Sequence, residues 1–242
     1  MIAALGWGAL AASSLVLGAL LAFARGWPPR QVGLVLAFGA GALISAVSFE
    51  LAAEGLRVGG LGAMAIGLGI GALTYFFLDG LIANRASAGR GRAGRASGSD
   101  PGTALALGAF LDGIPEQLVL GIGLAGGEGI GIGLLVAIFV SNLPEAIGSA
   151  SEMRGSGIDE RKIVRLWAAV AAICALSSAA GFAIADVVSG DLRAAIDGFA
   201  AGALLVMLVD SMIPDATRES GRAAGLVTTL GFAVATALSS VS

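Results

Sequence analysis

Histidine is absent from the 242 residues, and cysteine occurs once, at Cys174. The first absence excludes imidazole metal ligands, a histidine proton relay and a serine–histidine catalytic triad. The second excludes a disulfide within the chain and a metal cluster built from several thiolates. Charged residues are also scarce, at 13%, whereas they make up about a quarter of a typical soluble domain. Because the sequence also lacks a phosphate-cradling loop and a nucleophile–base pair, it predicts neither an enzyme nor an ATP-driven pump, and no organic cofactor.

Apolar residues, by contrast, make up 57% of the chain, and its mean hydropathy is +0.91. This composition indicates a protein embedded in a lipid bilayer. The 39 glycines and the many alanines suit membrane helices whose backbones approach one another closely. Faces of small residues also permit a homodimer. We therefore predict an all-α integral membrane protein with a single transmembrane domain over residues 1–242.

Eight apolar runs are long enough to cross a bilayer, which takes about 17–25 helical residues. They cover approximately residues 2–24, 31–53, 61–82, 104–125, 130–150, 163–188, 194–214 and 223–240. No basic segment precedes the first run and Arg25 follows it, so we expect a retained helix rather than a cleaved signal peptide. Residues 83–102 have no apolar period and are rich in Gly, Ser and Arg, which predicts a flexible loop. The fourth and fifth runs should be antiparallel, because only Gly126-Gly-Glu-Gly129 joins them.

Basic residues are distributed very unequally between the two sides of the predicted bundle. Twelve Arg or Lys residues belong to the loops between runs 1–2, 3–4, 5–6 and 7–8, and the other side has only Arg57 and Arg193. Under the positive-inside rule, the four basic loops are cytoplasmic and both termini are extracellular. This alternation supports the count of eight. We expect a multi-pass protein of a bacterial plasma membrane, the inner membrane.

Two short internal matches predict an inverted repeat. Phe38-Gly-Ala-Gly-Ala-Leu-Ile44 in the second run matches Phe199-Ala-Ala-Gly-Ala-Leu-Leu205 in the seventh, and the same register places Glu54 opposite Asp215. The Pro-Glu pairs at 115–116 and 144–145 form the second match. By the orientation above, matched runs cross the membrane in opposite directions. That arrangement is typical of transporters whose site lies at the repeat interface near mid-membrane.

Three carboxylates, those of Asp112, Glu116 and Glu145, belong to the middle of the fourth and fifth runs. Asp112 and Glu116 are four residues apart and share a helix face. A carboxylate at mid-bilayer costs ~2.5–3.5 kcal/mol on insertion scales, and no Arg or Lys at that depth can pair with these acids. They must therefore be protonated, hydrated or neutralised by a cation, and oxygen ligands favour hard or borderline divalent ions. The alternative is that protonated acids only hydrogen-bond neighbouring helices together.

Neutral oxygens and prolines accompany these acids. Ser141 and Asn142 precede Glu145 by four and three residues, so the three share a face, although helix serines commonly bond their own backbone. Pro115 and Pro144 each leave one backbone carbonyl without its helical partner. Those carbonyls either line a cation path or only mark kinks in the helices.

Other acids lie closer to the ends of the runs. Asp210 is predicted to be buried in the seventh run toward its cytoplasmic end, as a site member or an exit-path residue. Glu50 and Glu54 share a face near the outer end of the second run, where they form a vestibule or are simply solvated. Asp79 is expected at the inner interface. Asp197 is expected at the start of the seventh helix, where the helix N-terminus favours an acid.

At these residues the sequence resembles the ZIP (Zrt- and Irt-like protein) family of divalent-metal transporters. The family's helix-four motif, His-Asn-x-Pro-Glu-Gly, is similar to Asp112-Gly-Ile-Pro-Glu-Gln117. Its helix-five motif, His-Glu-x-Pro-His/Glu-Glu/Gly, is similar to Ser141-Asn-Leu-Pro-Glu-Ala146. The resemblance implies eight helices in a 3+2+3 inverted repeat, with outside termini and a variable cytoplasmic loop between helices three and four.

The resemblance also implies two neighbouring metal positions. Asp112, Glu116, Ser141 and Glu145 would line the first, and Glu116 and Glu145 would join Asn142 in the second. With Asp210 as the further candidate, these six residues are the predicted metal ligands.

Four positions depart from the family pattern. Asp112 replaces a histidine, Gly113 an asparagine ligand, Ser141 a histidine or polar donor, and Ser178 a helix-six glutamate. The departures imply a carboxylate-rich first position and a weakened second one.

We therefore predict a secondary or facilitated carrier that moves a divalent cation of the Zn, Fe, Mn or Cd class into the cytoplasm by alternating access. The alternative, motivated by the substituted ligands, is a non-transporting protein of the same type that senses metal or binds a partner. A third interpretation, an intramembrane hydrolase using Asp112 and Asp210, lacks the paired-aspartate context that such an enzyme needs. No nucleic-acid partner is expected.

Overall fold

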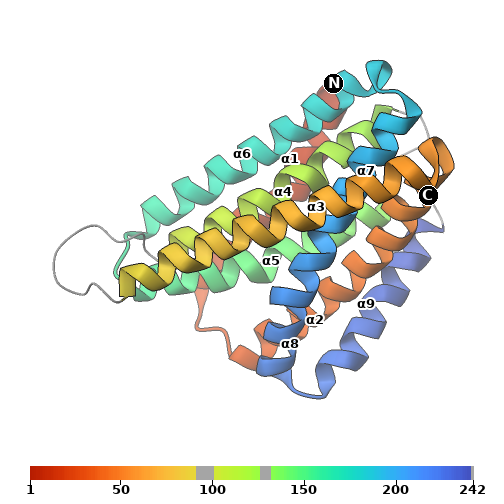
Figure 1. The fold of residues 1–242 in the computed structure, drawn as a ribbon. Helices are drawn as coiled ribbons and strands as arrows, with labels where there is room; N and C mark the ends of the chain where they lie inside the picture. The colour runs from red at the N-terminus through yellow and green to blue at the C-terminus, as the bar shows by residue number, and fades with distance from the viewer. Residues whose placement is uncertain (91–100, 126–131, 241–242) are drawn as a thin grey trace.

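The computed structural model describes residues 1–90, 101–125 and 132–240, and within these ranges the chain is helical, with short turns between elements (Figure 1). The elements in order are α1 (Ile2–Ala24), α2 (Pro29–Ser45), η1 (Ala46–Ala52), α3 (Ala53–Arg90), α4 (Pro101–Ala125), α5 (Ile132–Gly155), α6 (Glu160–Ile184), η2 (Ala185–Val187), α7 (Gly190–Met207), η3 (Leu208–Met212), α8 (Ile213–Ser220) and α9 (Ala223–Ser239). Here η1 and η3 are π-helical and η2 is a 3₁₀ turn.

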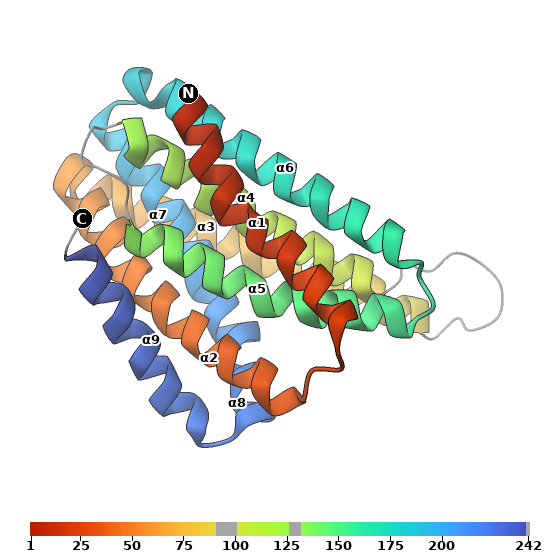
Figure 2. The ribbon, with the colours of Figure 1, turned by 180° about the vertical axis from the view of Figure 1, so that it is seen from behind.

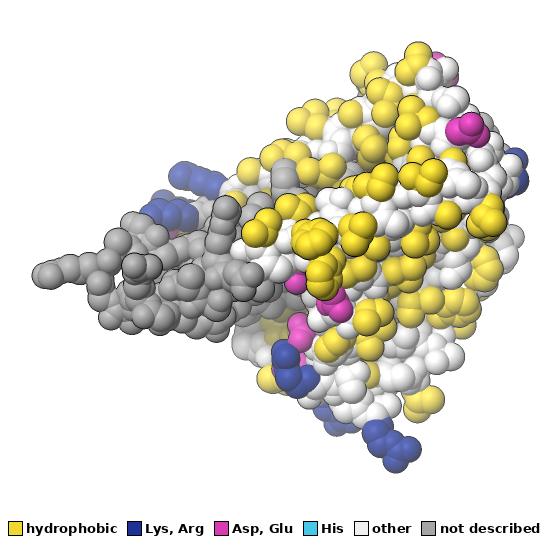
Figure 3. All heavy atoms as spheres, viewed as in Figure 1, with side chains coloured by type: hydrophobic (Ala, Val, Ile, Leu, Met, Phe, Trp, Pro, Cys, Tyr) yellow, Lys and Arg dark blue, Asp and Glu magenta, His cyan; other side chains and the backbone are white. Residues whose placement is uncertain are grey.

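Within the described residues, five helical stretches are long and apolar enough to cross a membrane. They are Ile2–Ala24, Pro29–Leu81, Gly133–Gly155, Glu160–Val187 and Gly190–Ser220, and two shorter apolar stretches, Gly113–Ala125 and Ala223–Ser239, accompany them. Hydrophobic side chains are spread over the described face in Figure 3, where charged side chains are few. The chain is thus an all-helical, multi-pass membrane protein.

Helix α3 reverses the chain within its own bounds. Gly60 has φ 76° and ψ 177°, a backbone conformation outside the helical region that glycine adopts without steric cost. Before this residue α2 and η1 run toward the end of the bundle that holds the termini, and after it α3 runs back (Figure 1). The 53-residue stretch Pro29–Leu81 therefore contains two helical segments of opposite direction rather than one.

The helix after this turn is longer than the apolar run from which it was predicted. The loop predicted over residues 83–102 is helical in the structure up to Arg90, and α4 begins at Pro101. Alanines in the first part of the segment favour a helix, and a proline is well suited to the first helical position. Residues 91–100, like the predicted tight loop at 126–129, lie outside the described residues.

The second and seventh apolar runs contain matching irregularities. The segments Phe38–Ile44 and Phe199–Leu205 lie in α2 and α7, and the π-helical η1 and η3 follow them. With the same separation of 161 residues, η3 falls within the stretch equivalent to η1. Gly221, which lies 161 residues after Gly60, also has a positive φ, of 60°. Each half of the chain thus has a π turn and then a glycine that reverses its direction.

The packing of these elements follows the same correspondence. Helix α3 packs against α7, where Gly71 meets the carbonyl oxygen of Phe199. Helix α2 packs against α9, where Gly231 meets the carbonyl oxygen of Phe38. In both pairs a glycine allows the backbones to touch, which is how membrane helices pack most closely.

The buried hydrophobic residues form two cores, and α4 contributes Val119 and Leu120 to the larger one. Buried residues of α2, α3, α7 and α9 form the larger core, which α5 joins near its start through Ile138. Buried residues of α1, α5 and α6 form the smaller core around Trp167, which α5 joins near its end through Ile147. Helix α5 therefore connects the two cores, and its segment between Ile138 and Ile147 holds the predicted site residues Ser141, Asn142 and Glu145.

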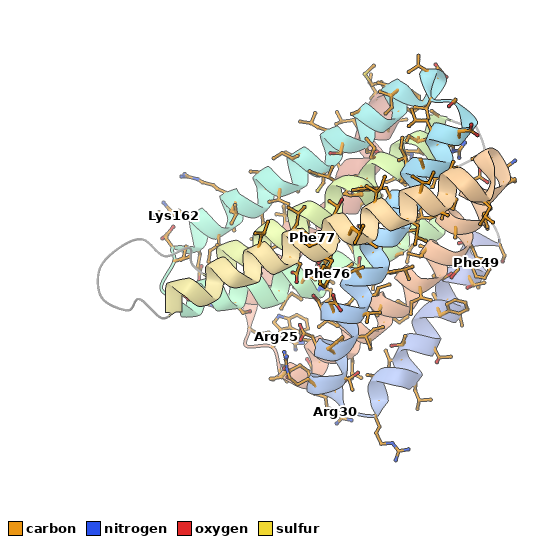
Figure 4. All side chains as sticks on the ribbon, viewed as in Figure 1. Arg25, Arg30, Phe49, Phe76, Phe77 and Lys162 are labelled. Atoms are coloured by element: carbon orange, nitrogen blue, oxygen red, sulfur yellow. The ribbon has the colours of Figure 1, made fainter. Side chains whose placement is uncertain are left out.

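Charged side chains and termini are separated along the bundle. Both ends of the chain lie at the same end of the molecule (Figure 2). Arg25, Arg30 and Lys162 lie toward the opposite end, whereas Phe49 is close to the C-terminus (Figure 4). This separation is what the uneven distribution of basic residues predicts.

Candidate functional site

The candidate site is built on two helices that each contain a proline. Pro115 lies inside α4 and Pro144 inside α5, and both helices continue through the proline. The two helices contact each other and run in opposite directions (Figure 2). Each proline directly precedes a glutamate, so Glu116 and Glu145 occupy equivalent places on the paired helices.

Glu116 is almost completely removed from solvent, with 2% of its surface exposed. Its Oε2 atom has no hydrogen-bond partner among the described residues. Glu145 is half-buried and lies close enough for the two carboxylates to repel each other. Burying an ion without a partner is costly, so this pair requires a proton or a cation.

Two polar residues of α5 are buried on the helix turn before Glu145. Ser141 is 1% exposed and Asn142 3% exposed. The Ser141 hydroxyl donates to the carbonyl oxygen of Ile138 at 3.1 Å, so it bonds its own helix as helix serines commonly do. A Cβ on Gly39 of α2 would lie 3.0 Å from the Ser141 Cα, which shows that α2 closes this side of the site.

Asp112 lies in α4 one turn before Glu116, but its side chain is outside what the structure describes. Among the described residues, no group of three or more His, Cys, Asp or Glu side chains is arranged to hold a metal ion. Glu116 and Glu145 are therefore the described carboxylates of the site, beside Ser141 and Asn142.

Asp210 lies in a different place from the other candidates. The sequence predicts that it is buried, whereas the structure leaves it exposed in η3. It lines an open groove of about 340 Å³ together with Phe76, Phe77 and Asp79 of α3. Phe76 and Phe77 lie midway along the bundle in Figure 4. The prediction of burial is wrong because the Asp210 side chain lines this groove between η3 and α3, and the groove is open at the surface of the protein.

The acids where η1 meets α3 have partners rather than being freely solvated. Glu54 accepts two hydrogen bonds of 2.7 Å from Arg57, and the Arg193 guanidinium of α7 reaches it at 3.1 Å. Arg193 also approaches Asp197 to 4.0 Å. Glu50 accepts a 2.6 Å hydrogen bond from the Ser239 hydroxyl.

Asp197 does not begin the seventh helix, contrary to the expectation from the sequence. Helix α7 starts at Gly190, because the Ser189 hydroxyl accepts from the Leu192 N–H and caps it. Asp197 is consequently two turns inside the helix and only 2% exposed. Its Oδ2 atom lies 4.0 Å from Nε of Arg193, four residues earlier, and neither atom has a hydrogen-bond partner among the described residues.

Two residues next to the site were not among the predicted ligands. The side chain of Gln117 is fully buried and its amide atoms have no partner in the described part of the chain. Cys174 of α6 is 1% exposed, and a Cβ on Gly113 would lie 2.6 Å from its Sγ atom. Glu116 is close enough to act electrostatically on this thiol.

Ser178, the α6 residue that the family resemblance implies at the second metal position, makes its hydrogen bond to another helix. Ser178 donates a 3.1 Å hydrogen bond to the carbonyl oxygen of Ala4 in α1, so it is engaged away from Glu116. Cys174 is one turn earlier on the same face of α6 and contacts Gly113. In the sequence, Cys174 could have been recognised as a neighbour of the site only from its spacing of four residues from Ser178, which places both on one face of the helix.

An all-helical membrane bundle with buried acids beside prolines in two paired helices belongs to the class of multi-pass ion-transport proteins. A search of curated proteins found no match to this chain. The ZIP zinc transporter family matches residues 86–239, which is well over half of the chain, and the protein therefore belongs to that family. The predicted family is confirmed, and with it the prediction that the protein is not an enzyme. Membership implies that the substrate is a divalent metal ion.

Proposed function

We propose that this protein carries a divalent cation into the cytoplasm by alternating access across a bacterial plasma membrane. Glu116 and Glu145 bind the cation, together with Asp112, Ser141 and Asn142. The observation that carries this proposal is the Glu116 carboxylate, which is buried, has no described partner and lies beside a second acid. A divalent ion would neutralise both carboxylates at once, and oxygen ligands suit such an ion.

We further propose that the chain crosses the membrane eight times as a 3+2+3 inverted repeat with both termini outside. The 161-residue correspondence between the π turns and between the reversing glycines supports the repeat. The paired α3–α7 and α2–α9 contacts support it as well. An ion pair is also repeated at the separation of 161 residues. Asp215 pairs with Arg218 at 2.9 Å, and the equivalent residues Glu54 and Arg57 pair in the first half.

The charges at the two ends of the bundle support inward transport. On the proposed outer side the two arginines, Arg57 and Arg193, are both paired with Glu54. Asp186 and Asp191 are exposed on the same side. An excess of negative charge at a channel mouth raises the local concentration of cations. Asp210, at the cytoplasmic half of the path, is proposed to act in release of the cation.

Metal flux into proteoliposomes tests the function directly. The purified protein should carry Zn²⁺, Cd²⁺, Mn²⁺ or Fe²⁺ inward, and Glu116→Ala and Glu145→Ala should each abolish the flux. Glu160→Ala is the matched control, because Glu160 is half exposed and pairs with the exposed Arg154. Full transport by both site variants would overturn the proposal.

The alternative is a metal-sensing or partner-binding protein that no longer transports. The glycine at position 113 and the absence of a three-acid group among the described side chains favour it. Metal binding with no flux in proteoliposomes would support this alternative and reject the carrier. A homodimer stays a prediction, which the mass of the detergent-solubilised particle would test.

A further inference from the structure

The sole thiol of the chain is directly beside the candidate cation site. Cys174 is fully buried in α6, and its Sγ atom lies against Gly113 of α4, one turn before Glu116. Glycine at this position leaves the space that the sulfur occupies, because even a Cβ would come within 2.6 Å of it. The contact therefore depends on two particular residues, one on each helix.

A buried cysteine is often only a small apolar packing residue. The surroundings of Cys174 differ from such a case on the side that faces α4. Glu116, which is 2% exposed and whose Oε2 has no described partner, acts electrostatically on the thiol. Gly113 precedes Glu116 by three residues on α4, so the Cys174 sulfur and the Glu116 side chain lie toward the same face of that helix.

We propose that Cys174 is a ligand of the cation bound at Glu116 and that it biases the site toward thiophilic ions, Zn²⁺ and Cd²⁺, over Mn²⁺. This inference rests on the proposed function and identifies its substrate class. Without the thiol the site is made of oxygen donors, which favour hard ions such as Mn²⁺. One sulfur among carboxylates suits Zn²⁺, which accepts both kinds of ligand.

The chemistry requires the thiol to lose its proton when the metal binds, since the thiolate is the form that coordinates. The Cys174 S–H bond breaks, the metal–sulfur bond forms, and the proton leaves to water. No electron is transferred, so no oxidant or reductant is needed.

Cys174→Ser in the full-length protein tests this inference by metal selectivity. Affinities for Cd²⁺, Zn²⁺ and Mn²⁺ are measured by calorimetry on the same preparation of protein in detergent. Even residues that only hydrogen-bond to a metal ligand typically contribute about 10–100-fold to metal affinity. Losing a direct sulfur ligand should therefore lower the affinities for Cd²⁺ and Zn²⁺ at least about tenfold. The affinity for Mn²⁺ should change little.

Two further measurements use the thiol itself. Cd²⁺ should produce a thiolate-to-metal absorption band in the wild-type protein and none in Cys174→Ser. Cd²⁺ should also slow alkylation of Cys174 by a small maleimide, whereas Mn²⁺ should protect it less. The matched control is Ser178→Cys in the Cys174→Ser background, which places a thiol one turn away, and this variant should restore neither the band nor the selectivity.

The outcomes separate this inference from the proposed function. If Cys174→Ser lowers the affinities for Mn²⁺ and Cd²⁺ by the same factor, or leaves the ratio of the two affinities unchanged, the proposal of a sulfur ligand is rejected. The proposed carrier function is not affected by either result. If the wild-type protein binds none of the ions, the proposed function itself fails. An unchanged absorption spectrum on adding Cd²⁺ to a wild-type protein that binds it would also reject the sulfur ligand.

Discussion

The carboxylate of Glu116 shows how a single residue can combine a structural cost with a function. It is buried beside a second acid, and its Oε2 has no partner in the described structure. A buried polar group without a partner costs roughly 1–3 kcal/mol, and a charged one costs more. The metal-free protein is therefore less stable than its packing alone would make it.

Substituting Glu116→Gln should make the metal-free protein more stable. The amide keeps the shape of the side chain and removes its repulsion from Glu145, so we expect a gain of about 1 kcal/mol. The same variant should lose the stabilisation that Zn²⁺ or Cd²⁺ gives the wild type, because the bound ion stabilises only a protein that holds it. Thermal unfolding in detergent with and without metal measures both effects. A lower melting temperature of the metal-free variant would contradict this account.

The ion pairs of Glu54 differ in burial, and this difference predicts unequal costs of removal. Arg193 is 21% exposed and connects Glu54 to the buried Asp197, whereas Arg57 is 59% exposed. Arg193→Ala removes the 3.1 Å ion pair with Glu54 and the cation nearest to the buried Asp197, so we expect a loss of about 1–3 kcal/mol. Arg57→Ala should cost less than about 1 kcal/mol, as for most exposed pairs. Chemical unfolding of both variants gives the comparison, and equal costs would show that burial does not decide them.

The sequence predicts the polar residues near the site better than their neighbours. Glu116, Ser141 and Asn142 are buried as expected, because polar residues in the middle of apolar helices rarely face lipid. Cys174 could not be assigned in this way, since its contact with Gly113 depends on which helices pack together. That choice is made by tertiary packing and leaves no local pattern in the sequence.

At the scale of elements, glycine determines how closely the helices approach. Gly71 and Gly231 lie where α3 meets α7 and α9 meets α2, each against a carbonyl oxygen of the neighbouring helix. A side chain at either position would separate the two backbones. Not every glycine has this role, because Gly69 has no atom within 4 Å of where its Cβ would be.

Alanine substitutions should therefore divide the glycines into two groups. Gly71→Ala and Gly231→Ala should each destabilise the protein by about 1–3 kcal/mol, since extra volume in a packed interface forces shifts. Gly69→Ala should raise stability by roughly 0.5–1 kcal/mol, because alanine favours the helix and meets no neighbour. Melting temperatures of the three variants provide the test. Similar effects at positions 69 and 71 would refute the assignment of close contacts.

The apolar runs indicate where helices lie but not how they are joined. The first run and α1 cover the same residues, 2–24, whereas α3 extends eight residues beyond its predicted end. Hydropathy marks the part of a helix that suits lipid, and a helix can continue into water when its residues favour it. The π turns also had no signal in composition, since they add a residue without changing polarity.

At the scale of the whole molecule, the distribution of charge predicts a fixed orientation. In the background of Cys174→Ser, a cysteine at Val187, which is 82% exposed, should react with a membrane-impermeant maleimide added outside intact cells. A cysteine at the exposed Ser156 should react only after the cells are opened. The measurement is labelling before and after permeabilisation. The reverse pattern would invert the topology and with it the proposed direction of transport.

The paired π turns have a consequence for the history of the chain. A π turn holds one residue more than the α-helical turn it replaces, so its presence in only one half would shift the numbering between the halves by one. Yet the separation is 161 residues both before the turns, at Phe38 and Phe199, and after them, at Gly60 and Gly221. If the halves descend from one duplicated unit, that unit already contained the inserted residue, and both descendants have kept it while most of their surrounding sequence diverged.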